Sequence, residues 1–390
     1  MQVVILAAGE SSRFWPLNQK HKSQIRLLGR PLIYWTIKGL AENGIKNIAI
    51  IISPGSSLEE DLKPISQELD LNFSFIVQEK PLSTGNAIFL AKDFIKEPFF
   101  IVWGAEVLTG EIVGKILEKD HSRAVLVGAE TDTPWDYGIF KLEGLPAGRQ
   151  GEKILEIVEN PKQGQEPSKI KKVGIYFLEP SFFDYYQKIS KHHEADFIEA
   201  LNLYLKDKKT ELLLWPEDVL SLKYPWDLFP ILEYLSKDVK DKIYIGKNCQ
   251  ISPNCHLRGP VSIGDNCKIG NGVEIKNSII GDGTRIPHLS YIGDSIIGEN
   301  CNLGAGTITA NLRFDKKTIK SKVKDKLLDT GREKFGCVIG NNTQAGINVS
   351  LMPGILIGSN CQIGPASLVR ENIEDNTTFY SEFKSAKKSA

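Results

Sequence analysis

Residues 261–281 read VSIGDNCKIGNGVEIKNSIIG, and an aliphatic residue recurs there at every sixth position. The same period begins at Ile245 and, after one-residue slips, resumes further along the chain. The aliphatic positions are Ile245, Ile251, Leu257, Ile263, Ile269, Ile275, Ile280, Ile286, Ile292, Ile297, Leu303, Ile339, Ala345, Leu351, Ile357, Ile363 and Val369. A fixed short period with one apolar residue per unit is typical of a β-solenoid. Three units complete one triangular coil, so residues 18 apart are expected to stack in the interior.

All six cysteines lie in this part of the chain, which first suggests a metal site or a disulfide framework. Five of them stand four positions after an aliphatic residue of the repeat, in a slot that elsewhere holds small residues such as Val261 and Thr284. These five are Cys249, Cys255, Cys267, Cys301 and Cys361. Free cysteine packs as a small apolar side chain, so we interpret them as packing residues. Cys337 alone lies outside the pattern.

The part of the chain before the repeat alternates apolar runs with segments of helical spacing. A chain of this kind predicts an α/β doubly wound domain with a largely parallel sheet, whose ligands collect at the carboxyl ends of the strands. The expected strands cover 3–8, 47–52, 73–77, 99–103 and 124–128, and the expected helices cover 32–43 and 58–69.

The composition is ordinary for a globular protein, with 41% hydrophobic and 25% charged residues and a net charge of zero. Balanced charge gives no general attraction to nucleic acid or to an anionic membrane, so neither is expected as a partner. No apolar run approaches the roughly 20 residues that cross a bilayer. The apolar start, Met1 to Gly9, has no basic leader and is interpreted as a strand, which favours a cytoplasmic location.

A run of small residues follows the first expected strand. The chain reads Leu6-Ala7-Ala8-Gly9-Glu10-Ser11-Ser12-Arg13, followed by Pro16-Leu17 and then Lys22. Small residues let backbone N–H groups approach phosphate oxygens, although a plain turn between strand and helix is the alternative. The string resembles the sugar-nucleotide pyrophosphorylase signature L-A-A-G-x-G-T-R-x-x-P-L. The resemblance implies nucleotide contacts at Leu6, Ala8 and Gly9, and catalytic cations at Arg13 and Lys22.

Five later segments resemble the same family. Residues 78–87, from Gln78 to Ala87, resemble its base-recognition segment, which implies nucleotide contacts at Gln78 and Thr84. Tyr137-Gly138 and Glu159-Asn160-Pro161-Lys162 resemble its sugar-binding elements, implying roles for Gly138 and Glu159. Val173-Gly174-Ile175-Tyr176 resembles N-x-G-I-Y. The string Tyr224-Pro225-Trp226-Asp227-Leu228 resembles the late segment that brings a metal-binding aspartate, here Asp227.

The chain also departs from the family pattern. Ser11 stands for the glycine of G-T-R, and His21 replaces the proline before Lys22. The family's Gly-Asp, whose aspartate binds Mg²⁺, appears here as Gly104-Ala105-Glu106. Either Glu106 still offers an oxygen to the cation, or Ala105 occupies the aspartate position and the ligand is lost.

Two strings within the repeat have side chains that a structural coil does not need. Residues 285–294 read RIPHLSYIGD and residues 302–311 read NLGAGTITAN. They resemble the bifunctional glucosamine-1-phosphate acetyltransferase/uridylyltransferase family, and residues 313–315 and 329–332 look like its archaeal-type variant. The resemblance implies a left-handed β-helix, a homotrimer and acetyl-CoA bound between neighbouring helices. It also implies His288 as the general base, a backbone N–H near Ala305 for the oxyanion, and sugar contacts by Tyr291, Asn302 and Asn311.

From Leu312 to Gly336 the repeat is interrupted by a lysine-rich segment. A solvated loop is one interpretation of it. The other is that Lys317 and Lys320 contact the phosphate of the sugar or the phosphates of coenzyme A. The glycine-rich stretch 144–151 is expected to be an exposed insertion without an assigned function.

The sequence therefore predicts a nucleotidyltransferase domain at 1–235 and a β-helix acetyltransferase domain at 236–390. The expected product is a UDP-N-acetylhexosamine made from hexosamine 1-phosphate, acetyl-CoA and UTP with Mg²⁺, with dTTP as an alternative nucleotide. Glucosamine and galactosamine both stay open. One rival is a nucleotidyltransferase whose helix serves only trimerisation or regulation, and a second is a non-catalytic assembly protein.

Overall fold

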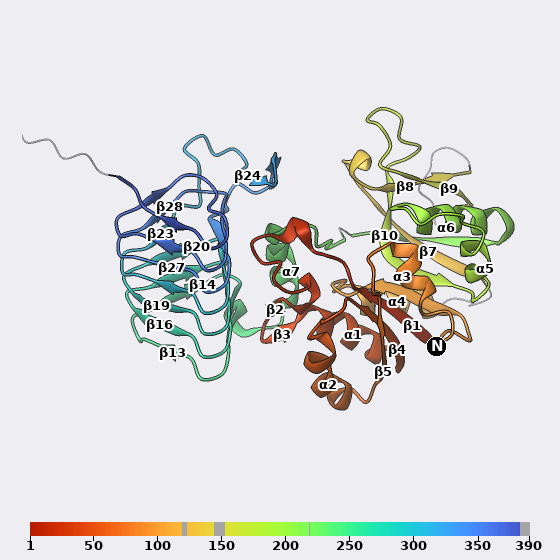
Figure 1. Cartoon of the computed structure of the whole chain (residues 1–390), viewed down its shortest axis with the longest axis horizontal. Coiled ribbons are helices and arrows are strands. Elements are labelled where there is room, and N and C mark those ends of the chain that lie inside the picture. The colour runs from red at the N-terminus through yellow and green to blue at the C-terminus, as the bar shows by residue number, and fades with distance from the viewer. Residues whose placement is uncertain (119–122, 144–152, 218, 383–390) are drawn as a thin grey trace, which may run out of the picture. The chain divides into compact units, whose positions relative to one another are not determined.

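The computed structural model describes residues 1–118, 123–143, 153–217 and 219–382. Its contacts divide the chain into two compact units (Figure 1): Met1–Glu10 with Leu32–Ser221, and Ser11–Pro31 with Leu222–Ala390. These units describe contacts, whereas the functional domains 1–235 and 236–390 remain a prediction. The predicted insertion at 144–151 lies outside the described residues.

The first unit is built on a mixed sheet with the strand order β11-β7-β10-β6-β1-β4-β5. Strand β1 lies parallel to both β4 and β6, as the apolar runs predict, but β10 is antiparallel to β6 and β7. A pair of antiparallel strands, β8 and β9, joins the sheet through β10. The strands are β1 (Gln2–Ala7), β4 (Asn47–Ile52), β5 (Asn72–Val77), β6 (Phe99–Trp103), β7 (Ala124–Glu130), β8 (Gly138–Leu142), β9 (Ile154–Glu159), β10 (Ile170–Leu178) and β11 (Thr210–Trp215).

The helices of this unit each bury one apolar face. In the first helix Ile33, Ile37 and Leu40 recur at helical spacing and are fully buried, so this face packs into the core. The two helices predicted from the sequence are confirmed to within one residue at their ends. The helices are α1 (Leu32–Glu42), α2 (Leu58–Glu68), α3 (Thr84–Phe89), α4 (Thr109–Leu117), α5 (Phe182–Tyr186) and α6 (Asp196–Asp207).

The second unit contains a β-helix whose three parallel sheets run along the stack of coils, as Figure 1 shows. Ile251 pairs with Ile269 and Leu257 with Ile275, which confirms stacking at a separation of 18 residues. Fourteen of the repeat's aliphatic residues, from Ile263 to Val369, are at most 5% exposed. The predicted fold class is confirmed.

The β-helix strands are short and group into three sheets. The first sheet holds β12 (Ile243–Ile245), β15 (Val261–Ile263), β18 (Ile279–Ile280), β21 (Ile296–Ile297), β26 (Cys337–Ile339) and β29 (Ile355–Ile357). The second holds β13 (Gln250–Ile251), β16 (Lys268–Asn271), β19 (Arg285–His288), β22 (Asn302–Leu303), β27 (Gln344–Ala345), β30 (Gln362–Ile363) and β32 (Thr378–Phe379). The third holds β14 (His256–Arg258), β17 (Glu274–Lys276), β20 (Tyr291–Gly293), β23 (Ile308–Thr309), β28 (Ser350–Leu351) and β31 (Leu368–Val369).

The corners of the coils depend on asparagine. Asn266, Asn342 and Asn360 adopt left-handed backbone conformations with φ near 58°, which asparagine tolerates better than most residues. The side chain of Asn342 also donates to Asn360 in the next coil at 3.0 Å. The one-residue slips are shortened corners, one between Ile275 and Ile280 and one between Ile292 and Ile297, and residues 17 apart pair across each of them.

The lysine-rich interruption is an ordered arm. Strands β24 (Lys320–Val323) and β25 (Lys326–Asp329) form an antiparallel hairpin, which extends from the stack of coils in Figure 1. Ile319 and Phe335 are buried at either end of the arm. The interpretation as a plain solvated loop is therefore incomplete, because apolar residues fix where the arm begins and ends.

The cysteines contribute to the β-helix core. Cys267 and Cys301 are 1% exposed, and their thiols donate to backbone carbonyls of the next coil at 3.2 and 3.1 Å. Burial raises the pKa of each of these thiols to about 12. All six cysteines are free, and this arrangement supports the packing interpretation. Within the described residues, no helix has the length and apolar character required to cross a membrane.

Candidate functional site

The predicted base-recognition segment of the first unit begins where β5 ends. Gln78 is 6% exposed, and its side-chain amide donates to the carbonyl of Ser83 at 3.1 Å and to Asn86 Oδ1 at 3.0 Å. Thr84 is the first residue of α3, and Ser83 caps this helix by accepting from the backbone N–H of Asn86. The structure therefore brings Gln78 and Thr84 together in one rigid turn.

A buried aspartate that the sequence analysis missed holds this turn. Asp196, at the start of α6, is fully buried and accepts from the backbone N–H of Gly85 at 3.0 Å. Its other carboxylate oxygen accepts from the hydroxyls of Ser83 and Tyr186. A side chain at Gly85 would lie 2.3 Å from the Tyr186 ring, so the close approach requires glycine. No local pattern links Asp196 to a segment more than a hundred residues earlier.

Replacing Asp196 with asparagine is expected to raise the KM for the nucleoside triphosphate by about tenfold, with a smaller change in kcat. The reason is that a buried charged acceptor of several hydrogen bonds is lost while its shape is kept. Steady-state rates of pyrophosphate release measure the effect. Asp184→Asn on the exposed side of α5 is the control. An unchanged KM in the Asp196→Asn variant would show that Asp196 does not position the base-recognition turn.

The predicted sugar-binding residues meet between β8, β9 and β10. Gly138 pairs with Glu159 across the two antiparallel strands. Lys172 on β10 forms an ion pair with Glu159 at 2.8 Å, and a side chain at Gly138 would lie 2.5 Å from this lysine. The structure thus brings Gly138 and Glu159 together and adds Lys172, a cation that no sequence motif indicated.

Glu106, the predicted metal ligand, lies beyond the end of β6. The backbone of Gly104 donates to Leu6 at 3.1 Å, so this loop lies beside the end of β1. The carboxylate of Glu106 faces Gly174 of β10, whereas Ala105 is buried in the core. Leu6 is buried, Ala8 is half-buried and Gly9 is exposed.

The remaining predicted groups for nucleotidyl transfer belong to the second unit. Ser11 has φ 52°, a left-handed backbone conformation that glycine adopts easily, and the family motif has glycine at this position. The hydroxyl group of Ser11 accepts a hydrogen bond from the backbone N–H of Lys22 at 3.1 Å. The ammonium group of Lys22 donates to the carbonyl of Leu222 at 2.5 Å. Arg13 lies in the 3₁₀ turn that follows Ser11 and is exposed.

Asp227 ends the short 3₁₀ turn that follows Leu222, the residue that Lys22 contacts. Its carboxylate accepts from the backbone N–H groups of Lys223 and Tyr224, both at 2.7 Å. Burial raises the pKa of Asp227, while the two backbone donors and the charges of Lys223 and Lys22 act in the opposite direction. A bound cation next to this carboxylate would offset the cost of burying its charge. Carboxylate oxygens of this kind suit Mg²⁺.

His21, which replaces the family's proline, is expected to make the protein sensitive to acid. Burial, and secondarily the charge of Lys22, lowers the pKa of His21 from 6.5 to about 4. The unfolded chain binds this proton first, so stability falls as the pH drops from about 6.5 to about 4, by at most about 3 kcal/mol. Denaturation midpoints of wild type and His21→Gln, recorded between pH 6.5 and pH 4, measure this loss of stability, and the variant should lose less than wild type. An equal loss in both would contradict the assignment, and His193→Gln at an exposed site is the control.

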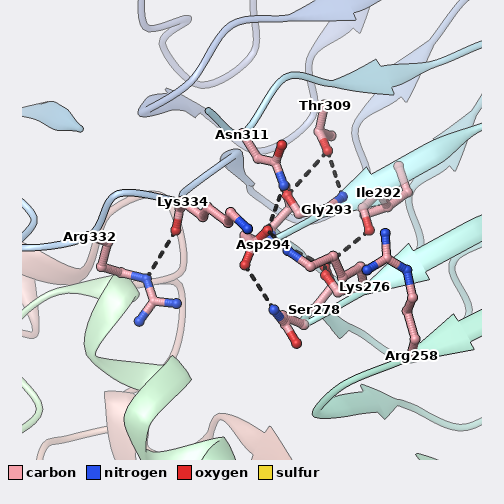
Figure 2. A network of polar contacts seen from close by, with 12 residues as sticks. Arg258, Lys276, Ser278, Ile292, Gly293, Asp294, Thr309, Asn311, Arg332 and Lys334 are labelled. Carbon is pink, nitrogen blue, oxygen red and sulfur yellow. Dashed lines mark hydrogen bonds and ion pairs between the residues drawn. The ribbon is translucent and has the colours of Figure 1, made fainter. Parts of the chain in front are cut away.

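A cluster of polar side chains lies on the third sheet of the β-helix; we call Lys276, Asn277, Tyr291, Asp294 and Asn311 the acetyl cluster. Asp294 is 1% exposed and lies at its centre (Figure 2). It accepts from the Lys276 ammonium group at 2.9 Å, from Asn277 at 3.1 Å and from Asn311 at 2.5 Å. Asn311 also donates to the hydroxyl of Tyr291 at 3.1 Å. Tyr291 and Asn311, both predicted from the sequence, are thereby brought together.

Lys276 was missed by the sequence analysis, although the repeat contains a signal for it. Glycine often follows the aliphatic residue of each unit, whereas Arg258 and Lys276 follow Leu257 and Ile275. These two cations pair with each other in adjacent coils, and Arg258 also forms an ion pair with Glu274 at 2.6 Å. Each of these two cations is thus paired with a carboxylate on the same sheet.

His288 is exposed at the end of β19, one corner before Tyr291. Arg285 pairs with Asn302 in the next coil, and His288 and Ala305 each lie three residues further on, at the same corner. Asn302 therefore lies beside Arg285, outside the acetyl cluster. Lys317 is exposed and its backbone donates to Asp315, while Lys320 lies opposite Asp329 in the arm. Neither lysine forms a hydrogen bond to the acetyl cluster within the described residues.

Three family models match successive parts of the chain. Residues 2–219 match the nucleotidyl transferase family, 239–344 match the GMPPB C-terminal domain, and 336–371 match the bacterial transferase hexapeptide family of six repeats. A Sulfurisphaera tokodaii protein named bifunctional sugar-1-phosphate nucleotidylyltransferase/acetyltransferase is 31% identical over 96% of this chain and 98% of its own length. A Methanococcus maripaludis bifunctional protein GlmU is 32% identical over 97% of each chain.

A solved structure supports the fold of the first part. The UDP-glucose pyrophosphorylase from Acinetobacter baumannii matches with a TM-score of 0.51 at 17% identity and covers 61% of this chain and 94% of its own. The mixed sheet and the repeat coils thus define a nucleotidyl transferase joined to a hexapeptide-repeat transferase. The chain belongs to the family of bifunctional sugar-1-phosphate nucleotidylyltransferase/acetyltransferases. It is an enzyme with both transferase parts, and its family implies a nucleotide and an acetyl donor as substrates.

Proposed function

We propose that this enzyme makes a UDP-N-acetylhexosamine in two reactions: N-acetylation of a hexosamine 1-phosphate by acetyl-CoA, and nucleotidyl transfer from UTP or dTTP. The observation that supports the proposal best is the acetyl cluster, in which Lys276, Tyr291 and Asn311 are held around buried Asp294. A purely structural coil does not need a buried ion pair and two oriented amides on its outer sheet.

In the acetyl transfer, the amine of the sugar attacks the thioester carbonyl carbon of acetyl-CoA. A protonated amine has no lone pair, so His288 as a neutral imidazole takes a proton from the attacking nitrogen. A backbone N–H near Ala305 stabilises the oxyanion. The C–S bond then breaks, and the imidazolium of His288 returns the proton to the departing thiolate.

The acetyl cluster orients the sugar in this scheme. Tyr291 and Asn311 contact its hydroxyl groups, and the ion pair of Lys276 with Asp294 holds these side chains in place. We also assign Asn302 to the sugar, and Lys317 and Lys320 to a phosphate of the sugar or of coenzyme A. Because the arm that carries these lysines is ordered, its contribution to phosphate binding does not require the folding of a disordered loop.

In the nucleotidyl transfer, a phosphate oxygen of the sugar 1-phosphate attacks the α-phosphorus of the nucleoside triphosphate, and pyrophosphate leaves. Leu6, Ala8, Gly9, Gln78 and Thr84 contact the nucleotide, and Gly138 and Glu159 contact the sugar. Arg13 and Lys22 offset the negative charge on the phosphates. Glu106 and Asp227 would hold Mg²⁺, which stabilises charge on the phosphate oxygens when it is bound.

We further propose a homotrimer that assembles through the β-helix and works in the cytoplasm. Leu289 and Ile347 are 66% and 56% exposed on the coils, and such apolar side chains favour contact with a second copy. Light scattering of the purified protein tests the trimer, and cell fractionation tests the location.

A substrate panel tests the two reactions separately. With acetyl-CoA and glucosamine or galactosamine 1-phosphate, release of the coenzyme A thiol is expected. With UTP or dTTP and a sugar 1-phosphate, Mg²⁺-dependent pyrophosphate release is expected. Pyrophosphate without thiol release would support the rival in which the β-helix only assembles the enzyme, and the absence of both would support a non-catalytic assembly protein.

A further inference from the structure

The segment Ser11–Pro31, which we call the front segment, is attached to the first sheet of the β-helix within the second unit. The backbone N–H of Leu28 donates to the hydroxyl of Ser262 on β15 at 2.9 Å, and Leu28 is 6% exposed. Arg26 forms ion pairs with Asp265 at 3.4 Å and with Asp282 at 3.3 Å. These two aspartates occupy the same corner of successive coils.

Other contacts of the front segment extend along the solenoid. Asn341 donates to Gln19 at 3.2 Å, and the indole of Trp15 donates to Asp375 at 3.2 Å. A side chain at Gly29 would lie 2.0 Å from the hydroxyl of Tyr244 on β12, and Gly29 has φ 75°. The front segment therefore fits closely against coils from the beginning to the end of the β-helix.

The turn that carries Asp227 is attached to the arm of the β-helix by aromatic rings. Phe335 is fully buried and contacts Trp226 edge-on at 6.0 Å between ring centroids and Phe229 at 6.1 Å. The guanidinium group of Arg332 lies over the ring of Phe229 at 4.5 Å. Such ring contacts have a preferred geometry, so they fix the turn as well as burying it.

A hydrogen bond joins the front segment to the chain that leads into the Asp227 turn. The Lys22 ammonium group of the front segment donates to the carbonyl of Leu222, which leads into the Asp227 turn. Lys22 and the turn that carries Asp227 are thus joined to each other, and each is supported by residues of the solenoid.

We propose that the β-helix is a positioning scaffold for nucleotidyl transfer, with Phe335, Asp265 and Asp282 as positioning residues for Lys22 and Asp227. This inference rests on the proposed role of those two groups. The β-helix would then serve both reactions, because it carries the acetyl-transfer site and also holds Lys22 and Asp227 in place for nucleotidyl transfer.

Full-chain variants test the proposal. Phe335→Leu removes the ring contacts but keeps an apolar side chain and the backbone bond to Asn311. We expect roughly tenfold lower kcat for pyrophosphate release and a higher Mg²⁺ requirement. The double variant Asp265→Asn with Asp282→Asn keeps the Oδ1 acceptors of the corner and removes the charges that face Arg26. Its expected loss is roughly threefold, because these pairs are partly exposed. Thiol release should stay within about twofold in both.

The controls are Phe379→Leu and Glu371→Gln, which change a ring and a charge in the last coils of the solenoid at residues that make none of the contacts described for the two attachments. Hydrogen exchange provides a readout that does not depend on activity. Faster exchange of residues 11–31 in the double variant and of residues 223–228 in Phe335→Leu is expected.

The outcomes separate the two hypotheses. Wild-type protection at both segments, or wild-type pyrophosphate release in both variants of an active enzyme, would overturn the scaffold. If wild type releases no pyrophosphate, the proposed nucleotidyl transfer fails, whereas the exchange measurement still decides whether the solenoid holds the two segments.

Discussion

His288→Ala is expected to abolish acetyl transfer while leaving Mg²⁺-dependent pyrophosphate release unchanged. General-base catalysis contributes about 10²- to 10⁴-fold, so thiol release should fall by this factor. His288 lies at the end of β19 and is exposed, so its loss removes no core packing. Parallel assays of coenzyme A thiol and pyrophosphate on one preparation measure both reactions.

His256→Ala is the matched control, because His256 is another exposed histidine at a strand of the same solenoid. It should leave both reactions at wild-type rates. Unimpaired thiol release by His288→Ala would exclude this residue as the base.

Asp294→Ala is expected to lower the free energy of unfolding of the β-helix by about 3–5 kcal/mol, because it leaves the buried charge of Lys276 without its partner. The side chains of Lys276 and Asp294 are 13% and 2% exposed, so water compensates little of the loss. Asn277 and Asn311 lose their acceptor in the same step. Chemical denaturation followed by circular dichroism measures the change.

Replacing both members of the pair distinguishes the lost charge balance from lost packing. Lys276→Met with Asp294→Leu should recover much of the stability, since apolar residues of similar volume often replace a buried ion pair without penalty. Acetyl transfer should stay absent in this double variant, because the amides of Asn277 and Asn311 are no longer oriented. A double variant as unstable as Asp294→Ala would contradict the charge argument.

Much of the fold could be predicted because its signals are local. One aliphatic residue in six specifies the solenoid interior, and the apolar runs locate β1, β4, β5, β6 and β7. The antiparallel direction of β10 was not predictable in this way, because a buried strand has the same apolar pattern in either direction. The ordered arm was missed because its buried residues, Ile319 and Phe335, are isolated within a run of lysines.

The candidate site likewise contains some residues that local sequence signals indicate and others that only tertiary packing brings together. Tyr291 and Asn311 were predicted from the resemblance of their strings, and the coil geometry explains why residues 20 apart meet. Asp196 could not be predicted, since only the packing of α6 against α3 brings it to Gly85. Lys276 could have been found as the charged residue in a glycine slot, because each position in a solenoid is judged against its equivalents in other coils.

The thiols inside the β-helix have a consequence for handling the protein in air. Burial raises the pKa of Cys337 to about 12, as it does for Cys267 and Cys301. A thiol with so high a pKa is almost entirely un-ionised at neutral pH, and the ionised form is what peroxide attacks. A chain with six cysteines should therefore keep its solenoid intact without added reductant, and oxidation should begin at the half-exposed Cys249 and Cys255.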